Sequence, residues 1–281
     1  MASTKEGPDI ARTSPAIDAP FAARKRRPLI ESLRAITALI LREMSTRYGR
    51  TPGGYVWALL EPIGMIIILG FAWSLVAKTP TLGTSFFLFK ATGFMVLQMV
   101  LIPANQVGRG MRFSRALLFY PRVRWLDALL ARFVLNTLVV TIVSAIIFTG
   151  IILYEEIRTV LDFGPIFLAM GLAALMGFSV GVFNCYMFQR IPVWEQVWTI
   201  TTRPLFLISG VIFIYEDLPD LAQAVLWWNP VLHLTGLIRD GFYPLYHPNY
   251  ISFVYLGVWI VAPMLIGLLL LRQYNRDLLN M

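Results

Sequence analysis

The sequence has few of the residues from which metal centres, disulfide frameworks and nucleotide-binding loops are built. Its 281 residues include one cysteine, Cys185, and two histidines, His233 and His247. A single cysteine excludes a disulfide within the chain, and this set offers no Cys/His spacing typical of a zinc site. Four lysines are present, and none lies in the Gly-Lys-Ser/Thr sequence of a P-loop. We therefore expect no metal site, no cofactor and no ATP hydrolysis in this chain itself.

Charge is also scarce, which excludes an ordinary soluble domain. Charged residues make up 14% of the chain and hydrophobic residues 57%, whereas about 25% of a soluble domain is charged. The mean hydropathy is +0.67, and several apolar runs reach the roughly 20 residues with which a helix crosses a bilayer. The sequence predicts an all-α membrane protein with six transmembrane helices, near residues 56–77, 86–107, 130–154, 163–188, 194–215 and 250–271.

Two segments precede the first span. Residues 1–28 are rich in Ala, Pro, Ser and charge, and predict a disordered tail ahead of a transmembrane domain over residues 29–281. Residues 29–48 carry apolar side chains at helical spacing with arginines between them. That pattern predicts an amphipathic helix at the membrane interface.

Two connections between spans are too apolar for simple loops. Residues 108–129 contain the stretch FSRALLFY, which predicts a short amphipathic helix that ends before Pro121. Residues 216–247 are apolar but interrupted by prolines. They predict two half-length helices, at about 219–228 and 230–242, which we interpret as re-entrant or interfacial.

The distribution of basic residues predicts the orientation in the membrane. Most of the 24 Lys and Arg residues lie before the first span, after the second span and in the C-terminal tail, whereas the opposite loops are rich in Asp and Glu. Because basic loops stay in the cytoplasm, both termini are expected there. This topology accounts for the net charge of +8 without a nucleic-acid partner.

The stretch RYGRTPGGYVWALLEP, residues 47–62, places helix breakers before the first span and an acid within it. The Pro-Gly-Gly sequence would turn the chain from the membrane plane into the span. Glu61 leaves two alternatives open, since an acid in lipid must have a partner. It either stabilises a kink at Pro62 by binding an arginine or the backbone, or pairs with an arginine across a moving contact.

Several side chains within the spans are candidates for a transport pathway. Arg203 lies about ten residues into the fifth predicted span, where it must face either an acid or a hydrated cavity. Lys90 lies near a span end and is expected to extend to the interface. Aromatic rings can bind sugar surfaces, although most of them must belong to the core and the interfacial belts. The pathway candidates are Glu61, Trp73, Tyr186, Trp198 and Phe206.

Two further patterns concern packing and energy supply. Ala173, Gly177 and Gly181 recur every four residues in the fourth span, which favours close approach of another helix. No predicted span carries a histidine, and Asp127 and Glu195 lie at span edges. This argues against coupling to an ion gradient and favours an external motor.

The order of these features resembles the permease subunits of capsular polysaccharide ABC exporters, of the KpsM type. The resemblance covers about residues 30–275. It rests on LREMSTRYGRTPGGYVWALLEP at 41–62, LLFYPRVRWLDALLAR at 117–132, and SGVIFIYEDLP with LWWNPVLH between 209 and 233. The long tail before Leu29 departs from the pattern.

The resemblance implies a homodimer with the pathway between its copies, bound to two ATPase subunits that hold the ATP and magnesium. It also implies a periplasmic adaptor and outer-membrane polysaccharide export proteins. The protein would lie in the bacterial inner membrane and move a lipid-linked polysaccharide outward. Segment 108–124 would correspond to a coupling helix, with candidate contacts Arg112, Phe113, Ser114, Arg115, Leu117, Leu118, Phe119 and Tyr120. Candidates for binding lipid phosphate or substrate are Arg47, Arg50, Arg112, Arg115, Arg122, Arg124 and Arg203.

Two alternatives stay open. Permeases for O-antigen or teichoic acid have a similar order of features. A membrane-embedded lipid-processing enzyme is the alternative from another class, for which His233, Asp240 and His247 are the only loose candidates.

Overall fold

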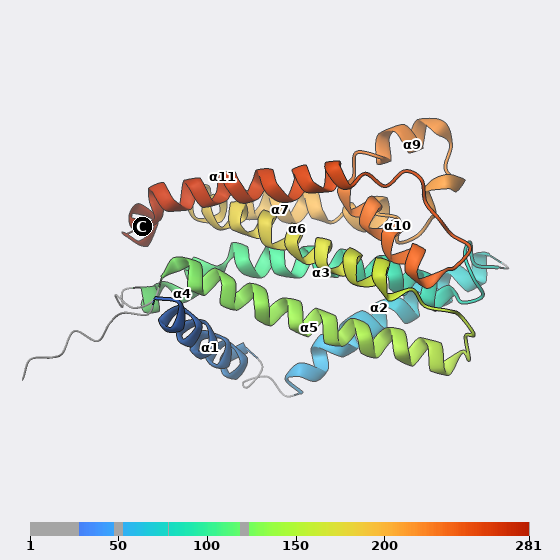
Figure 1. The fold of residues 1–281 in the computed structure, drawn as a ribbon, viewed down its shortest axis with the longest axis horizontal. Helices are drawn as coiled ribbons and strands as arrows, with labels where there is room; N and C mark the ends of the chain where they lie inside the picture. Colours follow the sequence, from blue (N-terminus) through green and yellow to red (C-terminus); the bar gives the residue numbers. More distant parts are fainter. Residues whose placement is uncertain (1–27, 48–52, 78, 119–123, 281) are drawn as a thin grey trace, which may run out of the picture.

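The computed structural model describes residues 28–47, 53–77, 79–118 and 124–280, and in this part of the chain all regular secondary structure is helical (Figure 1). Five helices are long and apolar enough to cross a membrane. They are α2 (Tyr55–Val76), α3 (Phe86–Gly108), α5 (Trp125–Tyr154), α6 (Phe163–Arg190) and α11 (Phe253–Asn280). They lie roughly side by side along the long axis of the molecule, which confirms an all-helical protein suited to a membrane.

Helix α3 lies at the centre of the bundle, between α2, α5, α6 and α10. It can approach α6 closely because of the small residues predicted to form a packing surface. A Cβ atom on Gly177 would lie 2.5 Å from the carbonyl oxygen of Val100, and one on Gly181 would lie 2.8 Å from Cβ of Val107. Such distances are sterically excluded, so only glycine permits this helix contact.

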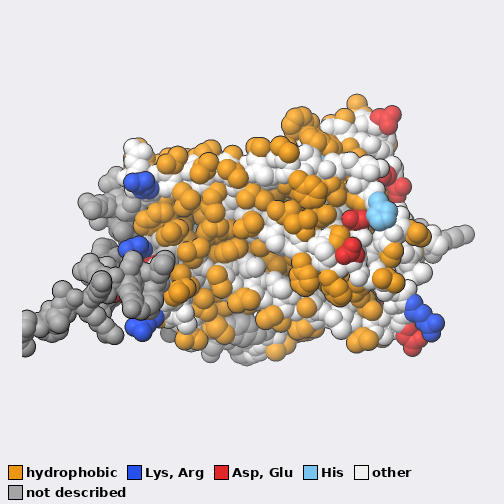
Figure 2. All heavy atoms as spheres, in the orientation of Figure 1, with side chains coloured by type: hydrophobic (Ala, Val, Ile, Leu, Met, Phe, Trp, Pro, Cys, Tyr) orange, Lys and Arg blue, Asp and Glu red, His pale blue; other side chains and the backbone are white. Residues whose placement is uncertain are grey.

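The outer surface matches a membrane environment. Hydrophobic side chains cover the middle of the face in Figure 2, and charged side chains gather at its two ends. Helices α2 and α11 contribute exposed apolar residues such as Ile68, Leu75, Val254 and Leu269. We call the end with α1 and α4 the basic end, and the end near α9 the acidic end.

Two helices lie at the basic end. Helix α1 (Pro28–Arg47) packs on α5, where the sequence predicted an amphipathic helix over 29–48. Helix α4 (Gly110–Leu118) follows α3 directly and corresponds to the predicted coupling helix, of which Phe119 and Tyr120 lie outside the described residues. The predicted tail, residues 1–28, also lies outside them except for Pro28.

The predicted span over 194–215 is not one helix. It consists of α7 (Trp194–Thr202) and α8 (Leu205–Ile208), followed by a non-helical stretch and a 3-10 turn at Tyr215–Asp217. Pro204 has no N–H for a helical hydrogen bond, and Gly210 adopts φ +75°, a left-handed conformation that ends a helix. A window of apolar residues could not reveal this interruption.

The two half-length helices are present as α9 (Asp220–Leu226) and α10 (Pro230–Phe242). Asn229 caps α10 by accepting a hydrogen bond from the N–H of Val231 at 3.0 Å, and Pro230 occupies the first helical position, where it is favoured. Helix α9 projects beyond the bundle (Figure 1), whereas α10 is largely buried against α6 and α3.

Lys90 was predicted to extend to the interface, and this prediction was wrong. The residue is 1% exposed, and Nζ donates a hydrogen bond to the carbonyl of Ile212 at 2.9 Å. A carbonyl partner within the protein makes burial possible, so the side chain has no need to reach water.

Candidate functional site

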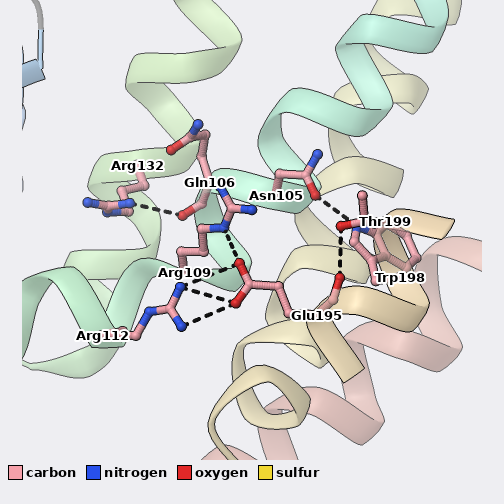
Figure 3. Close-up of polar contacts among 8 residues, drawn as sticks. All are labelled: Asn105, Gln106, Arg109, Arg112, Arg132, Glu195, Trp198 and Thr199. Atoms are coloured by element: carbon pink, nitrogen blue, oxygen red, sulfur yellow. Dashed lines mark hydrogen bonds and ion pairs between the residues drawn. The ribbon is translucent and has the colours of Figure 1, made fainter. Parts of the chain in front are cut away.

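Two arginines, one directly before α4 and one in its first turn, bind one carboxylate of α7 (Figure 3). Arg109 Nε lies 2.8 Å from Glu195 Oε1, and Arg112 Nη1 lies 3.2 Å from Glu195 Oε2. Arg109 separates α3 from α4, Arg112 lies in the first turn of α4, and Glu195 lies in the first turn of α7. This contact, the α4–α7 junction, therefore joins helices that are far apart in the sequence.

The junction is held by moderate forces. The side chains of Glu195 and Arg112 are 24% and 54% exposed, so each ion pair contributes about 1 kcal/mol or less. The carboxylate of Glu195, in the first turn of α7, also interacts favourably with the positive end of the helix dipole. One turn later Trp198 Nε1 donates a hydrogen bond to Asn105 Oδ1 at 2.8 Å. Together the ion pairs and this hydrogen bond are strong enough to align α7 with α3, and the ion pairs are weak enough to separate when the helices move.

A groove of about 330 Å³ lies beside the junction. Arg203 is exposed and lines the groove together with Glu195 and Arg109. Two arginines and one glutamate give the lining an excess of positive charge, and its other polar groups can exchange hydrogen bonds. The groove therefore suits a polar group with negative charge. Its lining consists of Arg109, Glu195, Gln196, Thr199, Ile200 and Arg203.

Arg132, on α5, connects three elements at the same end. Its Nε lies 3.3 Å from Glu43 Oε2 of α1, and the two side chains are only 9% and 14% exposed. Its Nη1 donates a hydrogen bond to the carbonyl of Gln106 on α3 at 3.2 Å. The guanidinium also lies 4.9 Å from the ring centre of Phe113 on α4, within cation–π range.

A second contact fixes α1 to α5. The hydroxyl of Ser32 donates a hydrogen bond to Asp127 Oδ1, and Asp127 also accepts one from the backbone N–H of Arg124 at 3.2 Å. Ser32 and Glu43 are eleven residues apart, about three helical turns, so both lie on the same face of α1. Helix α1 is therefore held to α5 at two points.

Sequence reasoning missed these connections. It used the basic residues after the second span only to predict the orientation in the membrane, and it placed Glu195 and Asp127 at span edges without partners. The available signal was the presence of isolated acids beside arginines at one end of the bundle, where charges require partners. The pairing itself could not be derived, because the partners are distant in the sequence.

The pathway candidates do not come together. Trp198 of α7 and Phe206 of α8 both face α3. The ring of Phe206 packs edge-on against that of Phe94, with 6.2 Å between the ring centres. The others contact different helices: Trp73 packs beside Lys90, Tyr186 beside Tyr274, and Glu61 is exposed on α2. Their roles stay predictions.

The phosphate and coupling candidates are placed in part. Arg112 belongs to the junction, Arg203 to the groove, and Arg124 is exposed at the start of α5. On α4, Phe113 is 61% exposed and Ser114 is 8% exposed. The remaining side chains lie outside the described residues: Arg47, Arg50, Arg115, Leu117, Leu118, Phe119, Tyr120 and Arg122. Among the described residues, no three His, Cys, Asp or Glu side chains meet as a metal site.

Comparisons with known proteins identify relatives of nearly full length. The chain is similar to the capsule polysaccharide export inner-membrane protein BexB of Haemophilus influenzae, with 27% identity over 245 residues, 87% of this chain and 92% of BexB. It is similar to the polysialic acid transport protein KpsM of Escherichia coli, with 26% identity over 245 residues, 87% of this chain and 95% of KpsM.

A third relative is the capsule polysaccharide export inner-membrane protein CtrC of Neisseria meningitidis serogroup A, with 25% identity over 248 residues, 88% of this chain and 94% of CtrC. The family model of ABC-2 type transporters matches residues 34–243. That range contains the α4–α7 junction, the groove and Arg132. The chain therefore belongs to the ABC-2 type transporter family.

Proposed function

We propose that this chain is the permease subunit of an ABC exporter that moves capsule polysaccharide outward across the inner membrane. The observation that carries the proposal is the near-complete alignment with three inner-membrane or transport proteins named for capsule polysaccharide or polysialic acid. The five apolar helices suit a membrane subunit. The chain is a transport subunit and no enzyme, and ATP and magnesium would be bound by two partner ATPase subunits.

The chain would cross the membrane six times. The α7–α8 segment begins near the basic end, where α6 finishes, and leads towards the acidic end that carries α9 (Figure 1). The broken segment would therefore make the fifth crossing. The positive-inside rule would place the basic end in the cytoplasm, and we expect both termini on that side as well. Helices α9 and α10 would then lie at the periplasmic side.

The α7–α8 segment would form a wall of the pathway. No residue of α7 or α8 is buried, and the segment exposes Gln196 and Thr199 on α7 and Arg203 between the two helices. Polar groups at membrane depth need water or polar partners. We infer that this face borders a hydrated conduit between two copies of the chain, and that Arg203 contacts negative charge on the lipid-linked glycan.

The junction and Arg132 would transmit movement from the ATPase. An ATPase subunit that moves α4 would pull on α7 through Glu195, and on α5 and α1 through Arg132. Helix α4 would seat in the ATPase through exposed side chains such as Phe113. The exporter would also need a periplasmic adaptor and outer-membrane export proteins, which would meet the acidic end.

Deletion of the gene in its own bacterium tests the proposal. The glycan retained in the cytoplasm and the glycan on the cell surface are analysed, and the intact gene is returned as the control. Capsule polysaccharide trapped inside, with a bare surface, supports the proposal. Trapped O-antigen or teichoic acid assigns the chain to that other cargo, and unchanged surface glycan contradicts a role in glycan export.

A further inference from the structure

The chain between α8 and the 3-10 turn has no helical structure, although it lies inside the protein. Ser209, Gly210 and Val211 are buried, and the residues up to Phe213 form a turn and bends. Non-helical backbone at membrane depth is tolerated only where other protein groups satisfy its polar atoms. Its carbonyls therefore need donors from other parts of the protein.

Side chains from two other segments bind five carbonyls of this stretch. Asn229 Nδ2 donates to Ile208 O at 2.9 Å. Thr235 Oγ1 donates to Ser209 O at 2.8 Å. Arg239 donates to Gly210 O at 2.6 Å and to Phe213 O at 3.0 Å. Lys90 Nζ donates to Ile212 O at 2.9 Å.

We call these four donors the carbonyl clasp: Lys90 of α3, Asn229 before α10, and Thr235 and Arg239 of α10. Each is at most 8% exposed. Together they tie the outer end of the α7–α8 segment to both α3 and α10.

Within the described residues, neither Lys90 nor Arg239 belongs to an ion pair. Aromatic faces support them instead, since Lys90 Nζ lies 4.3 Å from the ring centre of Trp73 and the Arg239 guanidinium 4.0 Å from that of Phe89. Burial of a cation costs free energy unless hydrogen bonds replace those it made to water. The carbonyls of this stretch therefore stabilise the buried cations, and the cations in turn satisfy the buried carbonyls.

The backbone itself is packed closely at this place. A Cβ atom on Gly93 of α3 would lie 2.8 Å from Cα of Val211, and one on Gly210 would lie 2.7 Å from Leu232 of α10. The clasped stretch is therefore held by steric fit on both sides as well as by hydrogen bonds. By contrast, the two helices that precede this stretch, α7 and α8, have no buried residue.

We propose that Lys90 and Arg239 are positioning residues of the exporter, which fix the outer end of the α7–α8 segment so that movement is confined to α7. Arg203 and Pro204 mark the boundary between the mobile and the fixed parts. A pull at Glu195 then displaces the cytoplasmic half of the segment, while its outer half keeps its shape against α3 and α10. This inference rests on the proposed function in assigning the segment to the pathway.

Cysteine labelling of the full-length chain in isolated membranes tests the clasp without requiring transport. The natural Cys185 is replaced by serine, and Val211→Cys places a thiol at a site that is 0% exposed. The rate of reaction with N-ethylmaleimide is then measured in Lys90→Met and Arg239→Met. Lys90→Arg keeps a cationic donor, and Arg158→Met, at an exposed position, is the matched control.

Loss of one hydrogen bond from a charged donor is expected to raise the labelling rate roughly 10- to 100-fold, with Lys90→Arg and Arg158→Met near the unmodified rate. If the Arg239→Met variant does not insert into the membrane, the labelling rates of Lys90→Met and Thr235→Val, each of which lacks one donor of the clasp, are compared instead. Equal labelling in all of these variants overturns the clasp.

Export and ATP hydrolysis by the complex with its ATPase form the second measurement. Lys90→Met should reduce export about tenfold or more while the KM for ATP stays unchanged, and Lys90→Arg should restore export. Unchanged export in Lys90→Met overturns the positioning role. If the unmodified complex exports no glycan although the labelling pattern holds, the proposed function fails and the clasp stands.

Discussion

Replacement of Glu195 by glutamine removes the negative charge from the α4–α7 junction and keeps nearly the same shape. Arg109 and Arg112 lose their carboxylate partner at 2.8 and 3.2 Å, and α7 loses an acid in its first turn. With both arginines partly exposed, each lost ion pair costs about 0.5 kcal/mol and the lost dipole interaction about 0.5 kcal/mol. The total of roughly 1.5 kcal/mol shifts the equilibrium of the junction about tenfold towards the open form.

Export and ATP hydrolysis are measured side by side on the complex with its ATPase. Because ATP would be bound by the partner subunits, Glu195→Gln should keep the KM for ATP and lower the glycan exported per ATP hydrolysed by about tenfold at most. Arg112→Gln removes the partner from the α4 side, and should lower the same ratio by a smaller factor because that side chain is 54% exposed.

A double-mutant cycle decides whether the two residues act together. If the junction transmits movement, Glu195→Gln combined with Arg112→Gln has less effect than the sum of the two single changes, with a coupling energy of about 0.5 kcal/mol or more. Strictly additive effects, or an unchanged ratio of export to hydrolysis in Glu195→Gln, would refute the reasoning.

Three further predictions concern other parts of the molecule. Arg132→Met removes the ion pair with the nearly buried Glu43, so the folded bundle should lose about 3 kcal/mol, seen as a lower thermal unfolding midpoint in detergent. An unchanged midpoint would contradict the role of Arg132. Gly177→Ala places a methyl group 2.5 Å from a carbonyl of α3 and should also lower the midpoint, whereas Gly171→Ala meets nothing within 4 Å and should leave it unchanged. Arg203→Gln should reduce export of an anionic glycan and leave ATP hydrolysis intact; equal export of the anionic glycan would exclude contact with its charge.

Much of the fold follows from local sequence properties. The length of the apolar runs predicted five of the helices, and the prolines within residues 216–247 predicted the start of α10 at Pro230, because these signals depend on neighbouring residues alone. The interruption at Pro204 lies within an apolar run. The hydropathy of that run does not show whether the backbone carbonyls are bound within a helix or by side chains of other segments, so the break could not be predicted.

The site was less predictable than the fold. Arg109 and Glu195, and likewise Lys90 and Ile212, meet only after several helices have packed together. The sequence could indicate that charges near the spans need partners, as with Arg203, but it could not select those partners. Burial of Lys90 depends on a carbonyl freed by an unwound segment, which no periodicity reveals.

The central position of α3 has a consequence for the range of cargo. Helix α3 is the most buried of the five apolar helices, with 72% of its most apolar stretch inside the protein. In the exporter proposed above, α3 would fill the centre of each copy, and the conduit would run along the outer surface of the bundle. Its width would then be set by the spacing between the two proposed copies and not by a rigid ring of side chains. Such a conduit would adjust to glycans that differ in branching or side groups, so that one chain would serve repeat units of different bulk.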